Sequence, residues 1–206
     1  MLRIPSVLII AIGFDVSRYM RTLPDYINKD IEILSVGINP SPLSVQRGYP
    51  FAAPRNRFWA ALNASHFTGA TYTPSVESMV DLLIVERIGF TDLVKRPTAG
   101  ISELRASDYR LGSSQLAAKI ELCSPRVVWF QGKTAYMKFL RYGLNRSDRS
   151  VGWGEQPPLY GGIDVYVTPN PSSANAAYSL KDICAWINRL AVFARRCAPM
   201  TSSLKA

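Results

Sequence analysis

Two asparagine–proline pairs are the residues of this sequence most suited to chemistry, because each follows a short apolar segment. Asn39-Pro40 follows residues 31–36, and Asn170-Pro171 follows residues 163–168. Proline fixes φ at about −65° and disfavours helical conformations in the preceding residue, so each amide side chain is held on a stiff turn. If both segments are parallel strands, the two amides lie at the carboxyl edge of one sheet, where open α/β sheets hold their ligands. We therefore expect a ligand site at this edge, with the two motifs side by side.

The chain is poor in the residues that metal and triad chemistry use. His66 is the only histidine, so a zinc site or a Ser/His/Asp triad is weakly supported. The three cysteines, Cys123, Cys184 and Cys197, include no C-x-x-C pair and are too few for a cluster held by four cysteines. Their odd number gives no disulfide framework and fits a reducing compartment. We expect no metal and no cofactor.

Length and charge limit the class of protein. A chain of 206 residues that is 48% hydrophobic can bury one core, and it fits one domain better than two. Its formal charge of +9 favours polyanionic partners, because each neutralised phosphate releases condensed counterions. The apolar residues 7–12 are far fewer than the roughly 18 of a membrane helix. We expect no membrane association and a cytoplasmic protein, nucleoid-associated in a bacterium, or a nuclear or organellar one in a eukaryote.

Short apolar runs typical of buried strands alternate along the chain with segments whose apolar residues have helical spacing. This alternation predicts an α/β fold with a parallel sheet. Strands are expected at residues 31–36, 127–130 and 163–168, and residues 88–93 fit a strand or an ordered connection. Helices are expected at residues 56–65, 76–85, 115–123, 133–140 and 180–196. Ser179 and Asp182 have the spacing of a capping box before the last helix. Residues 44–54 and 142–162 are expected to be loops, and residues 102–112 are ambiguous.

Several motifs resemble those of the mismatch-specific uracil and thymine DNA glycosylases, a branch of the uracil-DNA glycosylase superfamily. In chain order they are Gly37-Ile38-Asn39-Pro40, Gly48-Tyr49-Pro50-Phe51-Ala52, Pro54-Arg55-Asn56-Arg57-Phe58-Trp59, Thr91-Asp92-Leu93-Val94 with Arg96-Pro97-Thr98, and Val167-Thr168-Pro169-Asn170-Pro171-Ser172. The resemblance covers residues 31–194 and implies a three-layer α/β sandwich, whose central, mostly parallel β-sheet is flanked by helices. We expect a glycosylase domain at 31–197, after an N-terminal extension of unknown role at 1–30 and before a C-terminal tail at 198–206.

The resemblance implies a monofunctional DNA glycosylase that flips uracil out of DNA and hydrolyses its N-glycosidic bond in base excision repair. Mispaired uracil is the expected substrate, with thymine, hypoxanthine and xanthine as further candidates. The expected partners are double-stranded DNA that contains uracil or a mismatch, and single-stranded DNA, and we expect a monomer. Two alternatives stay open. One is a module of the same fold that binds damaged bases without cutting, and the other is a hydrolase of free nucleosides, which the lack of a carboxylate cluster disfavours.

The first motifs supply the expected pocket. Asn39 matches the family's water-positioning residue; an amide orients a water but cannot accept its proton, so we expect slow turnover that relies on leaving-group stabilisation. Phe51 matches the aromatic residue that stacks on the flipped base, and Ile38 and Phe51 would present backbone groups to the base edge. Ser44 stands where uracil-restricted families carry a bulky ring, so the pocket would tolerate a 5-methyl group. Taken alone, Asn39 would be a turn residue and Phe51 a core residue.

The last motif supplies the expected contacts to the base and to DNA. Asn170 replaces a histidine that donates to the base carbonyl in sister families, and its amide could donate a similar bond; the less favoured alternative is that residues 168–172 are simply a strand-ending turn. In the mismatch-specific branch a bulky apolar or arginine side chain after the Pro-Ser motif fills the gap in the base stack, whereas only small residues follow here. The residues expected to contact DNA are Ser172, Ser173, Ala174, Asn175 and Arg57. The other candidate phosphate contacts are Arg47, Arg55, Lys133, Arg146 and Arg149, and each of these charges, like that of Arg57, is better explained as an ordinary solvated charge.

Ala174→Leu should increase the excision of uracil from duplex DNA, because a leucine-sized side chain fills the gap that a flipped base leaves. Each buried CH₂ is worth about 0.8 kcal/mol, so the extrahelical state should gain roughly 2 kcal/mol. Rates on uracil opposite guanine, opposite adenine and unpaired measure the effect. The wild-type protein could instead strongly prefer the G·U mispair and keep that preference when residues 173–175 are substituted. The side chain that fills the gap in the base stack would then lie elsewhere, for instance in residues 142–162.

Overall fold

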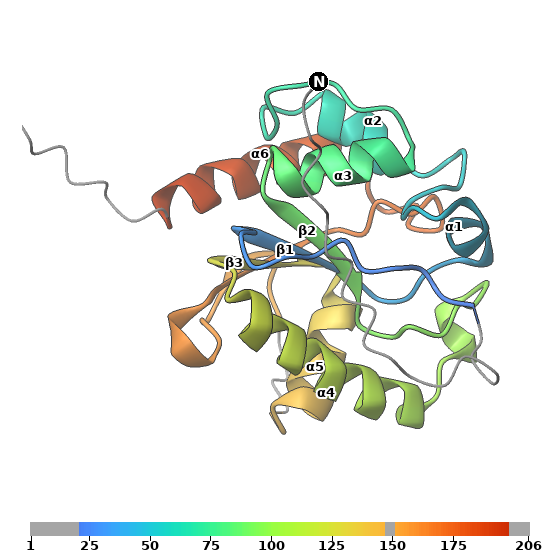
Figure 1. Ribbon diagram of the computed structural model, residues 1–206, viewed down its shortest axis with the longest axis vertical. Helices are drawn as coiled ribbons and strands as arrows, with labels where there is room; N and C mark the ends of the chain where they lie inside the picture. Colours follow the sequence, from blue (N-terminus) through green and yellow to red (C-terminus); the bar gives the residue numbers. More distant parts are fainter. Residues whose placement is uncertain (1–20, 147–150, 198–206) are drawn as a thin grey trace, which may run out of the picture.

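A five-stranded sheet forms the centre of the protein, in a computed structural model that describes residues 21–146 and 151–197. In spatial order its strands are β2 (Ile88–Asp92), β1 (Ile33–Gly37), β3 (Val127–Gln131), β5 (Asp164–Thr168) and β4 (Gly154–Gln156). The first four strands run parallel, and β4 pairs antiparallel with β5. Helices cover both faces of the sheet (Figure 1). The predicted three-layer sandwich with a mostly parallel sheet is confirmed.

One face of the sheet packs against α2 (Phe58–Asn63), α3 (Val76–Ile84) and α6 (Leu180–Arg196). Its hydrophobic cluster includes Phe90 and Trp129 from the strands and the apolar stripe of α6. The prediction of α6 is confirmed over its whole length, and so is its capping box: Asp182 N donates to Ser179 Oγ at 3.2 Å, and Ser179 N donates to Asp182 Oδ2 at 2.8 Å. This face therefore carries the aromatic part of the core.

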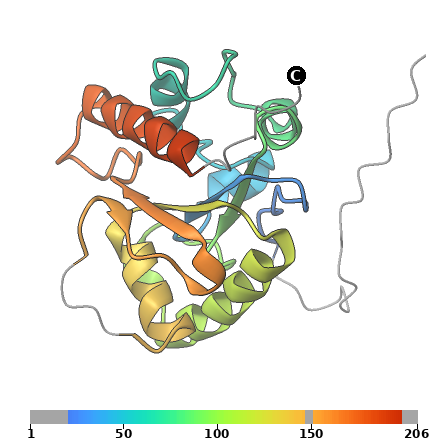
Figure 2. The ribbon, with the colours of Figure 1, turned by 90° about the vertical axis from the view of Figure 1, so that its left-hand side faces the viewer.

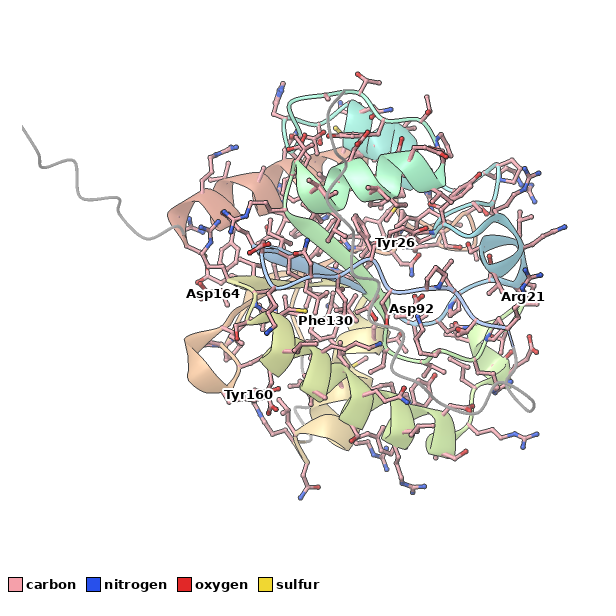
Figure 3. All side chains as sticks on the ribbon, viewed as in Figure 1. Arg21, Tyr26, Asp92, Phe130, Tyr160 and Asp164 are labelled. Atoms are coloured by element: carbon pink, nitrogen blue, oxygen red, sulfur yellow. The ribbon has the colours of Figure 1, made fainter. Side chains whose placement is uncertain are left out.

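The other face packs against α4 (Ala106–Cys123) and α5 (Lys133–Gly143), which also pack against each other (Figure 2). Val36 and Phe130 point to this side and are fully buried, and Figure 3 labels Phe130 between the sheet and these helices. Successive strand residues point to opposite faces, so a continuous apolar run such as β3 fills both clusters at once.

The expected loop at 44–54 is wrong in its first part, because a short helix, α1 (Pro42–Arg47), begins before it. Ser41 accepts a hydrogen bond from Ser44 N at 3.1 Å, which caps the helix, and Pro42 occupies a first-turn position that needs no N–H donor. Gly48 ends the helix in the left-handed region with φ 80°. Prolines that read as a stiff loop thus also start a helix.

The bounds of several other elements differ from the expected ones, and at α2 and α4 a polar side chain accepts a hydrogen bond where the helix begins. The ambiguous residues 102–112 contain a 3₁₀ turn, η2 (Ile101–Glu103), and the first turns of α4, where Arg105 N donates to Asp108 Oδ2 at 2.7 Å. α2 begins at Phe58 rather than 56, since Phe58 N donates to the Asn56 side chain at 2.9 Å. The expected loop at 142–162 includes β4 and the turn η3 (Tyr160–Gly162). Arg149 lies outside the described residues.

Residues 21–30, the described part of the expected N-terminal extension, pack against β2. Tyr26 is buried and forms an antiparallel bridge with Phe90. Asp25 accepts hydrogen bonds from Thr91 Oγ1 at 2.6 Å and Lys95 Nζ at 2.8 Å, and it pairs with Lys119 Nζ at 2.7 Å. The division into extension, domain and tail stays a prediction, with 1–20 and 198–206 outside the described residues. Within the described ranges, no helix is both long and apolar enough to cross a bilayer.

Candidate active site

Both asparagine motifs lie at the carboxyl edge of the sheet, as expected, but they are not side by side, because they follow strands that are not neighbours. β3 lies between β1, which leads to Asn39, and β5, which leads to Asn170. Asn170 Nδ2 donates to the carbonyl of Gln131, the last residue of β3, at 3.2 Å. The end of β3 therefore separates the two amides and supports the second one.

The loop that carries Asn39 is fixed by backbone pairing that continues past the ends of β1 and β2. Leu93 N donates to Gly37 O and Val94 N to Ile38 O, both at 2.9 Å, and Thr98 N donates to Pro40 O at 3.2 Å. Such bonds hold the loop along its length. The Asn39 backbone is therefore positioned by the chain that follows β2, more than fifty residues away in sequence.

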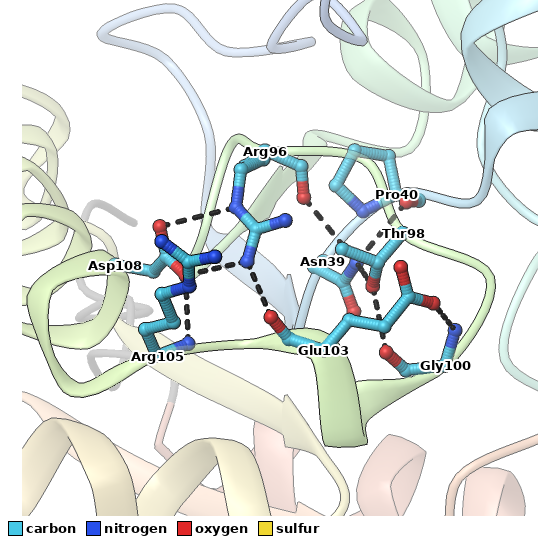
Figure 4. Close-up of polar contacts among 8 residues, drawn as sticks. All are labelled: Asn39, Pro40, Arg96, Thr98, Gly100, Glu103, Arg105 and Asp108. Carbon is cyan, nitrogen blue, oxygen red and sulfur yellow. Dashed lines mark hydrogen bonds and ion pairs between the residues drawn. The ribbon is translucent and has the colours of Figure 1, made fainter.

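Three acceptors surround the amide nitrogen of Asn39 (Figure 4). Asn39 Nδ2 lies 2.8 Å from Thr98 Oγ1, 3.3 Å from Arg96 O and 3.2 Å from Pro40 O. Thr98 Oγ1 donates its own hydrogen to Gly100 O at 2.9 Å, so it can only accept from the amide. The NH₂ end of the amide is thereby assigned, and its Oδ1 receives no hydrogen bond from any described residue. Only one of the three bonds is local, so Asn39 is more than a turn residue.

A second layer of polar contacts holds these acceptors in place. Arg96 donates to Asp108 through Nη2 at 2.7 Å and Nε at 3.2 Å, and to Glu103 O at 2.6 Å (Figure 4). The hydrogen bonds from Arg96 keep the pKa of the Asp108 carboxyl below its usual value. Gly100 N donates to Glu103 Oε1 at 3.0 Å. Residues 96–108 thus form a rigid support behind the Asn39 amide.

Phe51 lines a small cavity beside this loop. Its ring stacks on Phe58 with centroids 4.0 Å apart, and its φ of 59° is unusual for a residue with a side chain. The cavity is also bordered by Tyr26, Phe90 and Gly37. Phe51 is only partly buried, so the prediction that it offers an aromatic wall to a ligand fits its position. A backbone outlier at such a wall is the kind of local strain that functional sites retain.

Asp92 borders the same cavity, and sequence reasoning gave it no role. It ends β2 opposite Gly37, where a Cβ would lie 2.3 Å from Asp92 Oδ1, so the absence of a side chain at Gly37 makes room for the carboxyl group. Burial raises the pKa of Asp92 to about 6; Lys95 and Lys119 oppose this shift, and Asp25 adds to it. The signal that could have found it is the one used for Asn39, a polar residue at the carboxyl end of a strand.

Ser35 is a second polar residue at the cavity that the sequence did not reveal. It accepts a hydrogen bond from Gln131 Nε2 at 2.6 Å, and Gln131 does not itself border the cavity. Gln131 is buried, and its Oε1 has no partner among the described residues. A buried amide oxygen without a partner is costly, so Gln131 Oε1 is a position where a water molecule would be favourable.

Two expected pocket residues point elsewhere. Ser44 is buried inside α1, where its Oγ accepts from Ser41 Oγ at 3.1 Å and from Ala52 N at 3.4 Å. Ile38 packs against the cluster under α4 and α5. Neither residue is among those that border the cavity. Of the predicted pocket residues, Phe51 lies at the cavity, Asn39 and Asn170 lie at the same sheet edge, and the roles of Ser44 and Ile38 stay predictions.

The loop after β5 is closed on itself. Asn170 Oδ1 accepts from Ser172 N at 2.7 Å, and Asn175 Nδ2 donates to Asn170 O at 3.0 Å. Ala174 N lies 3.3 Å from Ser172 Oγ, and Ser173 and Ala174 are exposed at the tip. The Asn170 amide therefore keeps one N–H for a ligand, while the Asn175 side chain is turned back into the loop. The expected contact of Asn170 with the base and the expected contacts of residues 172–175 with DNA stay predictions.

Arg57 does not extend freely into solvent, contrary to what a phosphate contact suggests. It is partly buried, and its guanidinium donates to the carbonyls of four residues of the loop after β5, namely Pro171, Ser172, Asn175 and Tyr178. Elsewhere in the described ranges, no group of three or more His, Cys, Asp or Glu side chains is arranged to hold a metal ion.

This arrangement, a parallel α/β sheet with a rigid amide and an aromatic-walled cavity at its carboxyl edge, defines the class of fold and site. The model of the uracil DNA glycosylase superfamily matches residues 24–191, so the chain belongs to this superfamily. A similar solved structure is the solution NMR structure of a protein from Methanosarcina acetivorans proposed to be a uracil DNA glycosylase. That protein is 22% identical, with a TM-score of 0.55, and the match covers 86% of this chain and 97% of the other. At this identity the likeness shows the shared fold alone.

Asp92→Asn should make the protein more stable at neutral pH, and the gain should shrink in acid. The folded pKa of Asp92, about 6, lies above its usual value of 3.8, so the folded state binds the proton more tightly than the unfolded state. That contribution to stability is present below pH 3.8 and is lost as the pH rises through 6. One pKa unit corresponds to about 1.4 kcal/mol, so the free energy of unfolding of the variant, relative to that of the wild type, should increase by on the order of 1 to 3 kcal/mol as the pH rises from about 4 to about 7.5.

Urea unfolding of the two proteins across this pH range measures the difference in the free energy of unfolding. A difference that is the same at every pH would mean that the Asp92 carboxyl group ionises in the folded protein as it does in the unfolded chain.

Proposed function

We propose that the protein is a monofunctional DNA glycosylase that flips uracil out of DNA and hydrolyses its N-glycosidic bond. Mispaired uracil is its first substrate, with thymine, hypoxanthine and xanthine as further candidates, and it acts as a monomer in the cytoplasm on duplex and single-stranded DNA. The observation that carries the proposal is the Asn39 amide, whose nitrogen is held by Thr98, Arg96 and Pro40 while its oxygen has no partner among the described residues. Superfamily membership agrees with this chemistry.

The free oxygen of Asn39 suits it to orient a water molecule. Oδ1 accepts one O–H of the water and leaves an oxygen lone pair for the sugar carbon once the base is extrahelical. Because an amide cannot take the proton, the roughly 10²- to 10⁴-fold contribution of a general base is forgone. The burden moves to the leaving base, where hydrogen-bond donors aimed at the developing anion are worth roughly 3 kcal/mol each. This division of labour gives a slow enzyme.

Extrusion of the base costs a few kcal/mol, and least for a mispaired base. Phe51 offsets part of that cost, since stacking a base on an aromatic ring is worth about 1 to 3 kcal/mol. Its ring is already braced by Phe58, 4.0 Å away between centroids, so little order remains to be imposed when the base arrives. The net charge of +9 draws the duplex to the protein.

Asn39→Ala should abolish nearly all excision while the fold and the affinity for DNA survive, because the side chain belongs to a loop and not to the core. The assay uses duplex and single-stranded oligonucleotides, each with one lesion, followed by alkaline cleavage; binding is measured on the same oligonucleotides. Near-normal excision by the variant would refute the mechanism. A wild-type protein that binds the lesions without cutting any of them would instead be a damaged-base-binding module.

Thr98→Val should lower excision by up to about a hundredfold, the cost that misplacing a reacting group by about 1 Å can reach. Valine keeps the volume of threonine but removes the acceptor 2.8 Å from Asn39 Nδ2, so the amide is held only by the longer contacts to Arg96 O and Pro40 O. Thr98→Ser keeps the hydroxyl group and is the matched control, which should stay close to the wild type. Single-turnover rates on a uracil duplex measure the effect, and equal rates for the valine and serine variants would remove Thr98 from the site.

A further inference from the structure

We infer that Arg57 is a positioning residue, which holds the loop of residues 170–178 in its DNA-engaging shape from inside the protein instead of binding a phosphate. The inference rests on the proposed function, because it assigns this loop to contact with DNA. Arg57 comes just before α2, more than a hundred residues from the loop. A single side chain therefore joins the segment before α2 to the loop after β5.

The guanidinium is surrounded by carbonyl oxygens of the loop. Nε lies 3.3 Å from Pro171 O and Nη2 lies 2.9 Å from Asn175 O. Nη2 also donates to Ser172 O, and Nη1 donates to Tyr178 O. The backbone adds Arg57 N to Pro171 O at 3.1 Å. Residues 171 to 178 are thus held at both ends and in the middle by one planar group.

Arginine is the side chain suited to this task. Its five N–H donors point outward from one rigid plane, so they reach acceptors that are far apart along the chain, whereas lysine offers three donors on a single atom. Residues 165–181 contain no Asp or Glu, and no acidic side chain pairs with Arg57 among the described residues. The cation is therefore solvated by the loop carbonyls, which makes the loop shape and the position of the charge depend on each other.

The neighbouring residue gives the clamp its functional consequence. Phe58, next in sequence, stacks on Phe51, the aromatic wall of the cavity. Arg57 and Phe58 thus fix the distance between the wall that would receive a base and the loop that would meet the emptied stack. Preorganising both elements lowers the ordering cost of binding, and that cost would return if the clamp were lost.

A phosphate contact and an internal clamp differ in their response to charge and to salt. A phosphate contact needs the charge, so lysine replaces arginine well; losing it reduces the slope of log affinity against log salt by about 0.9 for duplex DNA. A clamp needs the planar fork, so lysine fails as badly as glutamine, and the salt slope stays that of the wild type. Arg55, which is exposed and only two residues away, is the matched control for charge.

The experiment compares Arg57→Lys, Arg57→Gln and Arg55→Gln with the wild-type protein on a uracil-containing duplex at several salt concentrations. Thermal unfolding and hydrogen exchange of residues 172–178 are followed in parallel. Both Arg57 variants should bind about tenfold more weakly, with an unchanged salt slope and faster exchange confined to the loop. An Arg57→Lys variant that binds like the wild type, beside a weaker Arg57→Gln variant with a reduced slope, would overturn the inference in favour of a phosphate contact.

Chemical rescue gives an independent measure of the clamp. Arg57→Ala leaves a hole under the loop, and added methylguanidinium should restore loop protection and DNA affinity, whereas methylammonium at equal ionic strength should not. Equal rescue by both ions, or by neither, would count against a clamp. If the variants fail to fold, the wild-type protein decides: loop amides protected without DNA support preorganisation, and loop amides that exchange like an unstructured peptide refute it.

These readouts separate the clamp from the proposed function. A wild-type protein that excises no base would refute the glycosylase, while loop protection and its dependence on the guanidinium would still decide the role of Arg57.

Discussion

The backbone pairing that runs past the ends of β1 and β2 is the constraint on which the rest of the site depends. Leu93 N donates to the carbonyl of Gly37, the last residue of β1, and beyond the sheet Val94 N donates to Ile38 O and Thr98 N to Pro40 O. Because the two loops form one unit, Thr98 and the carbonyl of Arg96 reach the Asn39 amide. Prolines stiffen each loop locally, and the pairing sets where the stiff pieces lie.

The sequence predicted the parts of the fold that depend on local patterns. Apolar runs located β1, β3 and β5, and a capping box with a helical stripe located α6. The start of α4 was not predicted, because its first turns carry polar residues and a buried glycine, Gly112. The close approach of Gly112 to Leu93 is a tertiary contact that the local sequence does not display. The packing of residues 21–30 was not predicted for a similar reason. It depends on the ion pairs of Asp25 with Lys95 and Lys119, which are distant in sequence.

The candidate site divides in the same way. A motif located Asn39, Phe51 and Asn170 at the sheet edge, since their positions follow from short segments. The partners that decide how these residues act lie far away in sequence: Thr98 is 59 residues from Asn39, and the loop carbonyls are more than a hundred residues from Arg57. Ser44 shows what the sequence leaves open, because its small size read as an open pocket, whereas its side chain is buried in α1 next to the capping residue Ser41, so its role stays a prediction. Residue type alone cannot separate these cases.

The surroundings of Asn39 also explain why this position suits an amide better than a carboxylate, although a carboxylate would be the stronger base. Arg96 O and Pro40 O can only accept, and Thr98 Oγ1 has already given its hydrogen to Gly100 O. A carboxylate oxygen placed there would face the two carbonyl oxygens, and it could accept a hydrogen bond only if the Thr98 hydroxyl turned away from Gly100 O, so the surroundings would raise its pKa. An amide directs the two N–H groups of its NH₂ toward these three acceptors, and its oxygen stays fixed and available to the water of the proposed mechanism. In the proposed mechanism, the support that holds the Asn39 amide therefore favours a neutral side chain over a carboxylate base, and the slow turnover that we propose follows from this preference.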